Sequence, residues 1–483
     1  MKVYRSADLV QLGRHIPTPF LLETYKGDAL ETIQVDEILR VVPKKRLIAK
    51  AKWRGSVVIA KLFFAPMRWR RNLSSDIAGI QLLKESNLRT PAILHKAQIA
   101  GKKGALLVLQ YLDEGKTIME CLKEAKTKSE KQAWLSKAIR SLAACHRCGL
   151  WQSDIHTDNF LQLNNQIYYL DGGAIQAIED SFETEIIQRN LSLFLAQFTV
   201  DNDENIESLL NDYCVENKNL NIQSVKEIKI KVKEARILRL TKYEKKLLRS
   251  TTAHRRIKSL DKFAMYDRRI HSSSLENFID DPNNYIKNDK LMKDGNSTTV
   301  AEFSLEDKNY VIKRYNLKSF WQKFKYLFKL SRAAHCWKNG LVLRMLGIDT
   351  PRPIILVEDR FFGVFRRKAY LVSEKIEAPN LLEYTAEERV EQSDLPIIVR
   401  LFRNLFQTMI DYKISHGDMK ASNFIFHNDK LIVLDLDGMR RHRSKRSFEK
   451  AITKDFDRFL RNWKDGKYKE HFGRIIEELK ISF

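Results

Sequence analysis

The spacing of hydrophobic residues predicts one long helix in each half of the chain. Apolar residues recur every three or four positions in 134–143 and again in 401–410. This period is typical of a helix that buries one face. We therefore expect both stripes to pack into a core rather than to bind a cofactor.

Short apolar and β-branched runs predict strands upstream of each helix. VVIAKLFF (57–64) and YVIKRY (310–315) each carry a lysine, and ALLVLQYL (105–112) and AYLVSEKI (369–376) follow them. A helical segment ending in Thr-Pro, at Thr90-Pro91 and Thr350-Pro351, separates the two strands in each half; we interpret the dipeptide as turn chemistry. The two halves therefore share one order of elements.

A polar loop after each long helix repeats one pattern of carboxylate and amide residues. An aspartate is followed five residues later by an asparagine, and twelve residues after that by a second aspartate. The two copies are offset by 264 residues at all three positions. They are Asp154, Asn159 and Asp171 in the first half, and Asp418, Asn423 and Asp435 in the second. The ordered series predicts an internal duplication.

This order of a strand lysine, a loop Asp and Asn, and a further Asp is that of kinase-type phosphotransfer sites. Such sites hold nucleotide phosphates and metal and orient an acceptor hydroxyl. The sequence therefore predicts an α+β protein with two tandem protein-kinase-like domains. Each is expected to have a small antiparallel-sheet N-lobe and a mainly helical C-lobe.

In the second half, the loop HGDMKASN (416–423) supplies the expected catalytic residues. Asp418 is expected to orient the acceptor hydroxyl, and Lys420 to lie near the transferred phosphoryl group. Asn423 and Asp435 offer the oxygen ligands that Mg²⁺ prefers, and Lys313 is expected to bind the α/β-phosphates of the nucleotide. Asp437 has two readings, a second metal-site acid or a turn aspartate.

The segment 293–303 lies where a phosphate-covering hairpin belongs. Gly295 allows close approach of the backbone, and Ser297 and Thr298 add hydrogen-bond donors. We therefore expect these three residues to contact the nucleotide.

The first half has candidate residues for the same roles, but the residues around them differ. Asp154, Asn159 and Asp171 match the second-half triplet, and Lys61 is expected to pair with Asp76 on the following helix. The residues that differ are His156, in place of the loop lysine, and Lys44, Lys45 and Arg46, which replace the glycine loop as candidate phosphate contacts.

Length and charge set the expected domain limits. A chain of 483 residues suits two domains, which we place at 1–225 and 276–483. Between them, Lys226–Lys262 holds fourteen Lys/Arg against four Asp/Glu, a net charge of +10, with no Gly or Pro. We expect a basic helical connector over 226–275.

The net charge of +24 predicts a polyanionic partner. No aromatic-basic recognition motif supports nucleic-acid binding, which leaves a phosphorylated substrate or an anionic membrane surface. The five cysteines form no disulfide framework, and neither a signal sequence nor an apolar run of membrane-spanning length is present. We expect a cytoplasmic protein, either free or peripheral on a membrane.

With these motifs in hand, the chain resembles the lipopolysaccharide core kinase (Kdo/WaaP) family. The resemblance lies in HGDMKASNFIF (416–426), LIVLDLDGMR (431–440) and SRAAHCWKNGLVLRMLGIDTPRP (331–353), with WQSDIHTDNFL (151–161) as a diverged copy. It implies ATP, Mg²⁺ and transfer of the γ-phosphate to heptose or Kdo of the lipopolysaccharide inner core, at the cytoplasmic face of the inner membrane. The expected partner is thus lipopolysaccharide core or another lipid-linked sugar acceptor.

Two features leave alternatives open. No acidic residue lies between Asp307 and Asp349, so Lys313 has no helix partner, and Cys336 aligns with Asp76. Either half could therefore be a pseudokinase or scaffold that binds anionic partners, and a protein or small-molecule kinase on this fold is a third reading, although no A-P-E signature is present. The segment 316–335, rich in aromatics and lysines, is either an interfacial membrane helix or a core-facing helix.

Overall fold

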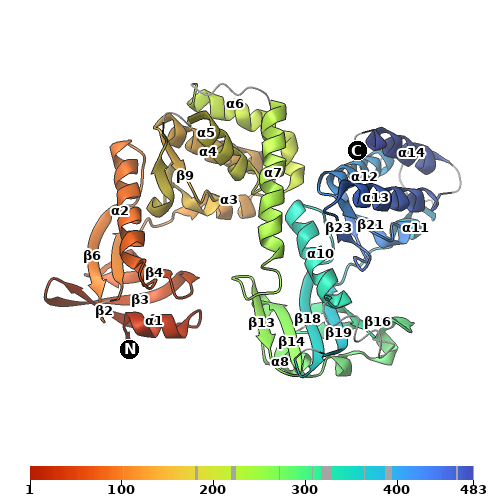
Figure 1. Cartoon of the computed structure of the whole chain (residues 1–483), viewed down its shortest axis with the longest axis horizontal. Helices are drawn as coiled ribbons and strands as arrows, with labels where there is room; N and C mark the ends of the chain where they lie inside the picture. Colours follow the sequence, from red (N-terminus) through yellow and green to blue (C-terminus); the bar gives the residue numbers. More distant parts are fainter. Residues whose placement is uncertain are drawn as a thin grey trace. The chain divides into compact units, whose positions relative to one another are not determined.

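The computed structural model describes residues 1–483 except 102, 180–182, 219–224, 271, 307, 317–328, 364, 387–393, 464–465 and 482–483. The chain forms two compact units. Unit 1 contains Met1–Gln197 and Asp203–Ala235, and unit 2 contains Phe198–Asn202 and Arg236–Phe483. Each unit has a sheet and a group of helices (Figure 1), so the chain has mixed helix and strand content as predicted.

Unit 1 begins with a seven-stranded sheet in the order β1-β2-β3-β4-β5-β7-β6, and an additional β2–β6 pairing closes it. Its elements are β1 (Lys2–Tyr4), α1 (Ser6–Leu12), β2 (Phe20–Lys26), β3 (Ala29–Val42), β4 (Arg46–Trp53), β5 (Ser56–Phe63), α2 (Trp69–Glu85), β6 (Ile93–Ile99) and β7 (Ala105–Gln110). Alternating residues of β2, β4 and β5 are buried in its core, which includes Phe20, Leu47 and Val58. The sheet thereby fixes β5, the strand that carries Lys61.

The rest of unit 1 is mainly helical. It contains β8 (Lys116–Thr117), α3 (Ile118–Glu124), α4 (Lys128–Arg147), β9 (Leu150–Gln152), β10 (Phe160–Leu163), β11 (Gln166–Tyr169), β12 (Ile175–Ala177), α5 (Glu183–Leu195), α6 (Ile206–Glu216) and the start of α7 (Val225–Glu244). Helix α4 begins at a capping box formed by Thr127 and Glu130. Leu135, Ile139 and Leu142 are buried, which confirms the predicted helical stripe.

Unit 2 also has a seven-stranded sheet, in the order β13-β14-β18-β19-β17-β16-β15. Its elements are β13 (His254–Lys258), β14 (Lys262–Asp267), α8 (Ser273–Asp280), β15 (Leu291–Gly295), β16 (Thr298–Leu305), β17 (Lys308–Tyr315), α10 (Arg332–Leu346), β18 (Pro353–Phe361) and β19 (Phe365–Glu374). They are followed by α11 (Leu381–Ala386), α12 (Asp394–Asp411), β20 (Ile414–Ser415), β21 (Phe424–His427), β22 (Lys430–Val433), β23 (Arg440–Arg441), α13 (Lys445–Leu460) and α14 (Lys467–Lys480).

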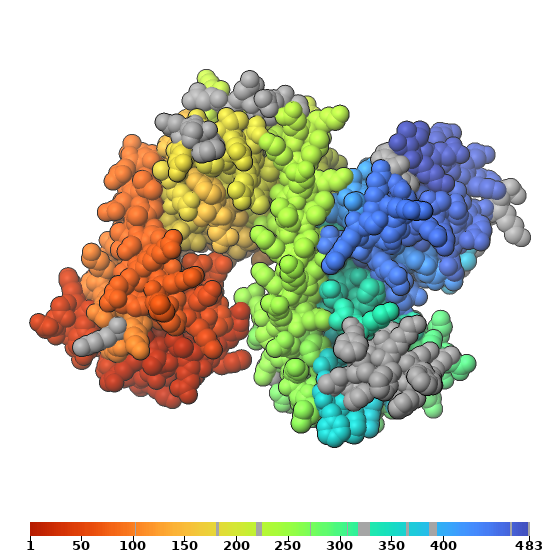
Figure 2. All heavy atoms as spheres, viewed as in Figure 1, coloured from red at the N-terminus to blue at the C-terminus, as the bar shows by residue number. Residues whose placement is uncertain are grey.

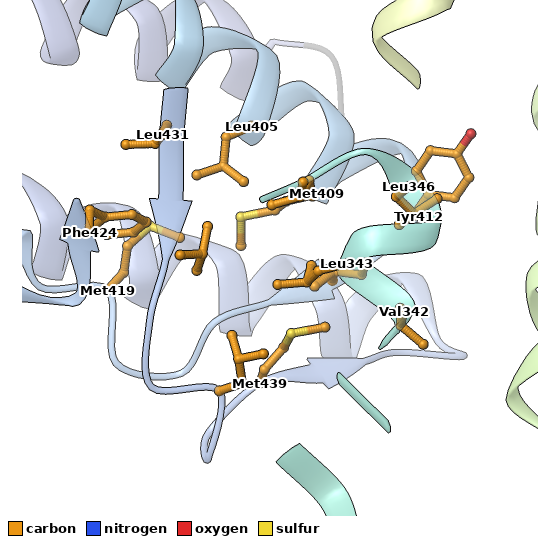
Figure 3. Close-up of a cluster of buried hydrophobic side chains, with 14 of the residues drawn as sticks. Val342, Leu343, Leu346, Leu405, Met409, Tyr412, Met419, Phe424, Leu431 and Met439 are labelled. Atoms are coloured by element: carbon orange, nitrogen blue, oxygen red, sulfur yellow. The ribbon is translucent and has the colours of Figure 1, made fainter. Parts of the chain in front are cut away.

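The helical part of unit 2 is built around the predicted stripe of α12. Phe402, Leu405 and Met409 are buried there. Figure 3 shows Leu405 and Met409 in a cluster with Leu343 of α10 and Phe424, beside the loop that carries Met419. This core therefore holds the polar loop 416–423 on a rigid base.

Five strands in each unit follow the same order, β3-β4-β5-β7-β6 in unit 1 and β15-β16-β17-β19-β18 in unit 2. The register also agrees. Ala60, which precedes Lys61, pairs with Val108, and Ile312, which precedes Lys313, pairs with Val372. The repeat seen in the sequence thus extends to strand pairing.

The expected helical connector differs from the structure. Helix α7, drawn in green in Figure 2, ends at Glu244, and its side chains Lys226 and Lys229 are exposed. Residues 254–258 and 262–267 instead form β13 and β14, and β14 pairs with β18. The reason is burial: residues 263–266 (Phe-Ala-Met-Tyr) fill the core of the sheet, and this tertiary pairing overrides helix propensity.

The four aromatic residues on which the interfacial-helix reading of 316–335 depends lie outside the described residues. Within the described part of the chain, no helix has the length and apolar character needed to cross a membrane.

Candidate functional site

A cavity of about 630 Å³ in unit 2 collects most of the predicted site residues of that half. Strand β17 contributes Lys313, the β15–β16 turn contributes residues 295–298, and the loops around β21 and β22 contribute Asn423 and Asp435. The predicted residues among its lining are Gly295, Ser297, Thr298, Lys313, Asn423 and Asp435. Asp418 and Lys420 are not part of this lining, but Asn423 Nδ2 donates to the carbonyl of Asp418 at 2.7 Å. The segment that carries Asp418 is thereby joined to a residue of the cavity lining.

Lys313 contacts two aspartates of the same loop. Its Nζ lies 2.9 Å from Asp435 Oδ1 and 3.1 Å from Asp437 Oδ2. Burial alone would lower the pKa of Lys313, but Asp437 and Asp435 raise it above its ordinary value. The ammonium therefore stays charged and is available to bind phosphate.

The polar loop 416–423 of unit 2 is held by contacts on two sides. His416 Nε2 lies 3.0 Å from the Leu434 carbonyl, and the Asp418 N–H donates to Nδ1 at 3.3 Å. Burial lowers the pKa of His416, so the neutral ring donates through Nε2 and accepts at Nδ1. On the outer side, Asp418 Oδ1 lies 2.8 Å from Arg458 and 3.4 Å from Lys420. These contacts fix the carboxylate that is expected to face the acceptor.

Asp455 of α13 anchors the start of this loop. Its carboxylate accepts the backbone N–H of His416 at 2.6 Å and that of Gly417 at 2.9 Å. Gly417 has φ of +83°, and a Cβ there would lie 2.6 Å from the Gly438 carbonyl, so this turn requires glycine. Asp455 was not identified from the sequence.

A pH prediction follows from Asp455. Burial raises its pKa to about 6, against the backbone hydrogen bonds that lower it. The folded chain thus binds this proton more tightly than the unfolded chain, so its stabilising contribution is present below about pH 4 and is lost as pH rises through about 6. Measured as free energy of unfolding against pH, the variant Asp455→Asn should lack this descending component between pH 4 and 6. Identical slopes for variant and parent would contradict the assignment.

Unit 1 contains the lysine–acid pair expected from its sequence. Lys61 Nζ lies 2.9 Å from Asp76 Oδ1 and 3.1 Å from the Leu170 carbonyl. The two residues are 6% and 1% exposed. Burial raises the pKa of Asp76, and Lys61 opposes that shift. Strand β5, helix α2 and the loop before Asp171 thus meet at one buried ion pair.

The polar loop of unit 1 repeats the internal geometry of unit 2. Asn159 Nδ2 donates to the Asp154 carbonyl at 2.9 Å. His156, which stands where unit 2 has Lys420, lies 3.2 Å from Asp158. Unit 1 therefore has a histidine at the position from which Lys420 contacts Asp418 in unit 2. Lys44 lies in the β3–β4 turn with φ of +61°. This turn occupies the place that the glycine-containing β15–β16 turn has in unit 2.

Both Thr-Pro threonines do more than form a turn. Thr90 Oγ1 donates to the Tyr169 carbonyl at 2.9 Å, and Thr350 Oγ1 donates to the Val433 carbonyl at 2.7 Å. Each acceptor lies two residues before the second aspartate of the motif. The threonines therefore tie the segment after the helix to the strand that positions Asp171 or Asp435, and only the recurrence of Thr-Pro upstream of the motif in both halves could have indicated this.

Helix α2 packs directly on the turn after Asp171. A Cβ on Gly79 would lie 1.8 Å from the Gly172 carbonyl oxygen, and a Cβ on Gly172 would lie 2.4 Å from that of Asp76. Only glycine permits this approach, which brings Asp76 to the Asp171 turn.

Substitution Gly172→Ala is therefore expected to lower the free energy of unfolding of unit 1 by about 1–3 kcal/mol, the usual cost of overpacking. The loss of protection of α2 amides from hydrogen exchange measures this destabilisation. Gly473→Ala is the matched control, because a Cβ there has nothing within 4 Å and alanine favours the helix. Unchanged protection in α2 would contradict the close packing.

The oxygen atoms of the two Asp-Asn-Asp triplets suit a divalent metal bound together with ATP. Asp171 Oδ1 is buried and has no hydrogen-bond partner among the residues that the structure describes. Asn159 and Asn423 use their Nδ2 atoms internally, which leaves each amide oxygen for a cation. These are hard oxygen ligands of the kind that Mg²⁺ selects. Among the described residues, no group of three or more His, Cys, Asp or Glu is arranged to hold a metal by itself.

Comparison with known proteins assigns the class. Residues 286–475 match the sequence model of a kinase family, so this part of the chain is a phosphotransferase with a sugar hydroxyl as acceptor and ATP as donor. The matching model is that of the Lipopolysaccharide kinase (Kdo/WaaP) family. The resemblance recognised in the sequence is therefore confirmed for the second half, while residues 1–285 lie outside the match.

A solved structure titled "WaaP in complex with acyl carrier protein" is similar to this chain at 18% identity and a TM-score of 0.28. The alignment covers 38% of this chain and 77% of that chain. No curated protein matches the chain significantly.

Proposed function

We propose that unit 2 is an ATP- and Mg²⁺-dependent kinase that phosphorylates heptose or Kdo in the inner core of lipopolysaccharide. The acceptor would be presented at the cytoplasmic face of the inner membrane, with the chain peripheral on it. The observation that carries this proposal is the convergence of Lys313, Asn423 and Asp435 on one cavity, inside the segment that matches the family.

Each residue of the cavity has a role that its position supports. Asn423 and Asp435 would hold Mg²⁺, which screens the phosphate charge when bound. Lys313 binds the α/β-phosphates, and the turn 295–298 covers them with Ser297 and Thr298 as donors.

Asp418 orients the acceptor hydroxyl and accepts its proton, while Lys420 stabilises charge on the transferred phosphoryl group. The contacts of Asp418 with Arg458 and Lys420 keep its carboxylate oriented.

We further propose that unit 1 is a second, diverged kinase-type domain, which makes the chain a tandem duplication. The support is the common strand order, the matching register around Lys61 and Lys313, and the paired Thr90 and Thr350 hydrogen bonds. The domain limits proposed from the sequence, 1–225 and 276–483, are then extended so that strands β13 and β14 belong to the second domain.

One observation favours a non-catalytic, nucleotide-binding role for unit 1. Its loop replaces the lysine by His156, which is engaged with Asp158, and replaces His416 by Gln152, whose buried Oε1 has no hydrogen-bond partner. Unit 1 would then be a pseudokinase beside an active partner. Phosphotransfer that persists in Asp418→Ala and is lost in Asp154→Ala would contradict this.

Mass spectrometry of the lipopolysaccharide core from cells tests the proposed activity. Cells that carry Asp418→Ala should lose phosphate from the core sugar, whereas Asp429→Asn, an exposed turn carboxylate, should leave it in place. Core phosphate that is unchanged in Asp418→Ala and in Asp154→Ala would remove the proposal.

A further inference from the structure

Unit 2 lacks the helix carboxylate that unit 1 uses to hold its strand lysine. Asp76 of α2 pairs with Lys61, but no Asp or Glu lies between Asp307 and Asp349. In α10 the facing residue is Cys336, whose Sγ lies 2.6 Å from Asp437 Oδ1. Asp437, a carboxylate of the loop after β22, therefore lies beside Cys336, where the helix has no acidic residue.

Both oxygens of Asp437 are surrounded by donors. Oδ2 lies 3.1 Å from Lys313 Nζ and 2.6 Å from an Arg332 nitrogen, and Oδ1 accepts from the Tyr315 hydroxyl at 2.8 Å and from Cys336. Burial raises the pKa values of Cys336 and Tyr315 well above their ordinary ranges, so both keep their protons and donate.

Each carboxylate oxygen of Asp437 thus has two partners, which come from β17 and α10. This set of contacts favours a positioning role for Asp437 over the alternative of a second metal-site acid.

The loop itself is fixed to α10. Asn339 Nδ2 donates to the carbonyls of Leu436 and Met439, both at 3.1 Å, and His335 Nε2 lies 2.7 Å from the Met439 carbonyl. Asp437 is thus presented by a segment that cannot shift independently of the helix.

We infer that Asp437 is the positioning carboxylate for Lys313, a role moved in this unit from the helix to the loop after Asp435. The inference rests on the proposed function of unit 2. It predicts that the carboxylate can be returned to the helix by exchanging the two side chains, as in the double variant Cys336→Asp with Asp437→Cys.

Mg-ATP binding and turnover by the full chain test this exchange. Asp437→Asn is expected to weaken Mg-ATP binding by about tenfold and to lower kcat/KM by about a hundredfold, the order of loss for a misplaced group. The double variant should recover at least about tenfold of that loss. A purely structural role would give no such recovery, and thermal unfolding shows which variants are folded.

The outcomes separate the two proposals. Failure of the parent chain to bind Mg-ATP would overturn the proposed function and this inference with it. A parent that binds Mg-ATP, together with a folded Asp437→Asn variant that binds and turns over equally well, would overturn this inference alone. So would a folded double variant no more active than Asp437→Asn.

A separate feature of unit 2 is an apolar tip made by two neighbouring strand turns. Leu260, in the β13–β14 turn, is 72% exposed, and Phe361 and Phe362, at the β18–β19 turn, are 47% and 69% exposed. The Gly363 N–H donates to the Leu260 carbonyl, so the two turns are joined, and the phenylalanine rings lie 4.4 Å apart.

Basic residues surround this tip. The segments 256–262 and 358–368 hold seven Lys/Arg against three Asp/Glu, a net charge of +4. The Arg367 guanidinium lies 5.1 Å from the Phe361 ring, and Lys258 and Lys368 are exposed. Large apolar side chains at a tip with a cationic rim suit the boundary between anionic headgroups and acyl chains.

We propose that this tip, Leu260 with Phe361 and Phe362, inserts into an anionic lipid surface. Sedimentation of the full chain with phosphatidylglycerol-containing vesicles, and with phosphatidylcholine alone, tests it. Binding should require the anionic lipid, weaken as salt is added, and fall about tenfold or more in Leu260→Ser with Phe362→Ser. Met67→Ser is the control, because Met67 is fully exposed elsewhere.

Equal vesicle binding by the double serine variant and the parent would overturn this second proposal. A concentration-dependent dimer that the double variant abolishes, without vesicle binding by the parent, would assign the tip to a second copy of the chain instead.

Discussion

Replacing Asp418 by asparagine is expected to lower kcat for phosphotransfer by about 10²–10⁴-fold, the usual contribution of a general base. The amide keeps the shape of the side chain but cannot take the proton of the acceptor hydroxyl. Mg-ATP binding should change little, because Asp418 does not line the cavity that contains Lys313 and Asp435. Initial rates with saturating Mg-ATP measure the effect.

The control for this prediction is Asp429→Asn, which removes an exposed carboxylate from the β21–β22 turn without touching the cavity. It should retain the parent rate. A variant Asp418→Asn whose kcat falls by less than about threefold would show that Asp418 is not the base, since such a change is under 1 kcal/mol in the barrier.

Replacing Lys61 by methionine is expected to destabilise unit 1 by about 3–5 kcal/mol at neutral pH, because it leaves the buried Asp76 without its counter-charge. Asp76 is 1% exposed, and its pKa is already raised by burial. Without Lys61 that pKa rises further, so a protonated Asp76 relieves part of the cost at low pH. The protection of β5 and α2 amides from hydrogen exchange measures the stability of unit 1 directly.

The direction in which the destabilisation by Lys61→Met changes with pH makes this prediction specific. A carboxyl whose folded pKa is raised stabilises the chain when protonated and loses that contribution as pH rises. The penalty of Lys61→Met should therefore be smaller near about pH 5 than near about pH 8. The double variant Lys61→Met with Asp76→Leu should recover much of the stability, and a penalty that does not depend on pH or on Asp76 would contradict the account.

The sequence predicted the parts of the site that depend on local order. Lys61, Asp76 and the two Asp-Asn-Asp triplets are set by strand, helix and loop positions that a repeat makes visible, and the Lys61–Asp76 contact has the expected partners. The long helices were visible because one face of each is apolar. Such features need only short stretches of chain to be recognised.

Other features depend on contacts between distant segments. Asp437 meets Lys313 across 124 positions of sequence, and nothing in the Asp-Leu-Asp pattern distinguishes a lysine partner from a metal ligand. Asp455 caps the loop from 38 residues away. Strand β14 was read as helix because its basic surroundings have high helix propensity, whereas pairing with β18 decides its structure.

The most direct test of the central claim is transfer of label from γ-labelled ATP to a purified core acceptor that lacks its phosphate, with the full chain as the enzyme. We expect Mg²⁺-dependent label on a heptose or Kdo hydroxyl, lost in Asp418→Asn and retained in Asp429→Asn. Label on the sugar that persists in Asp418→Asn, or its absence with the parent chain under conditions where Mg-ATP is bound, would contradict it.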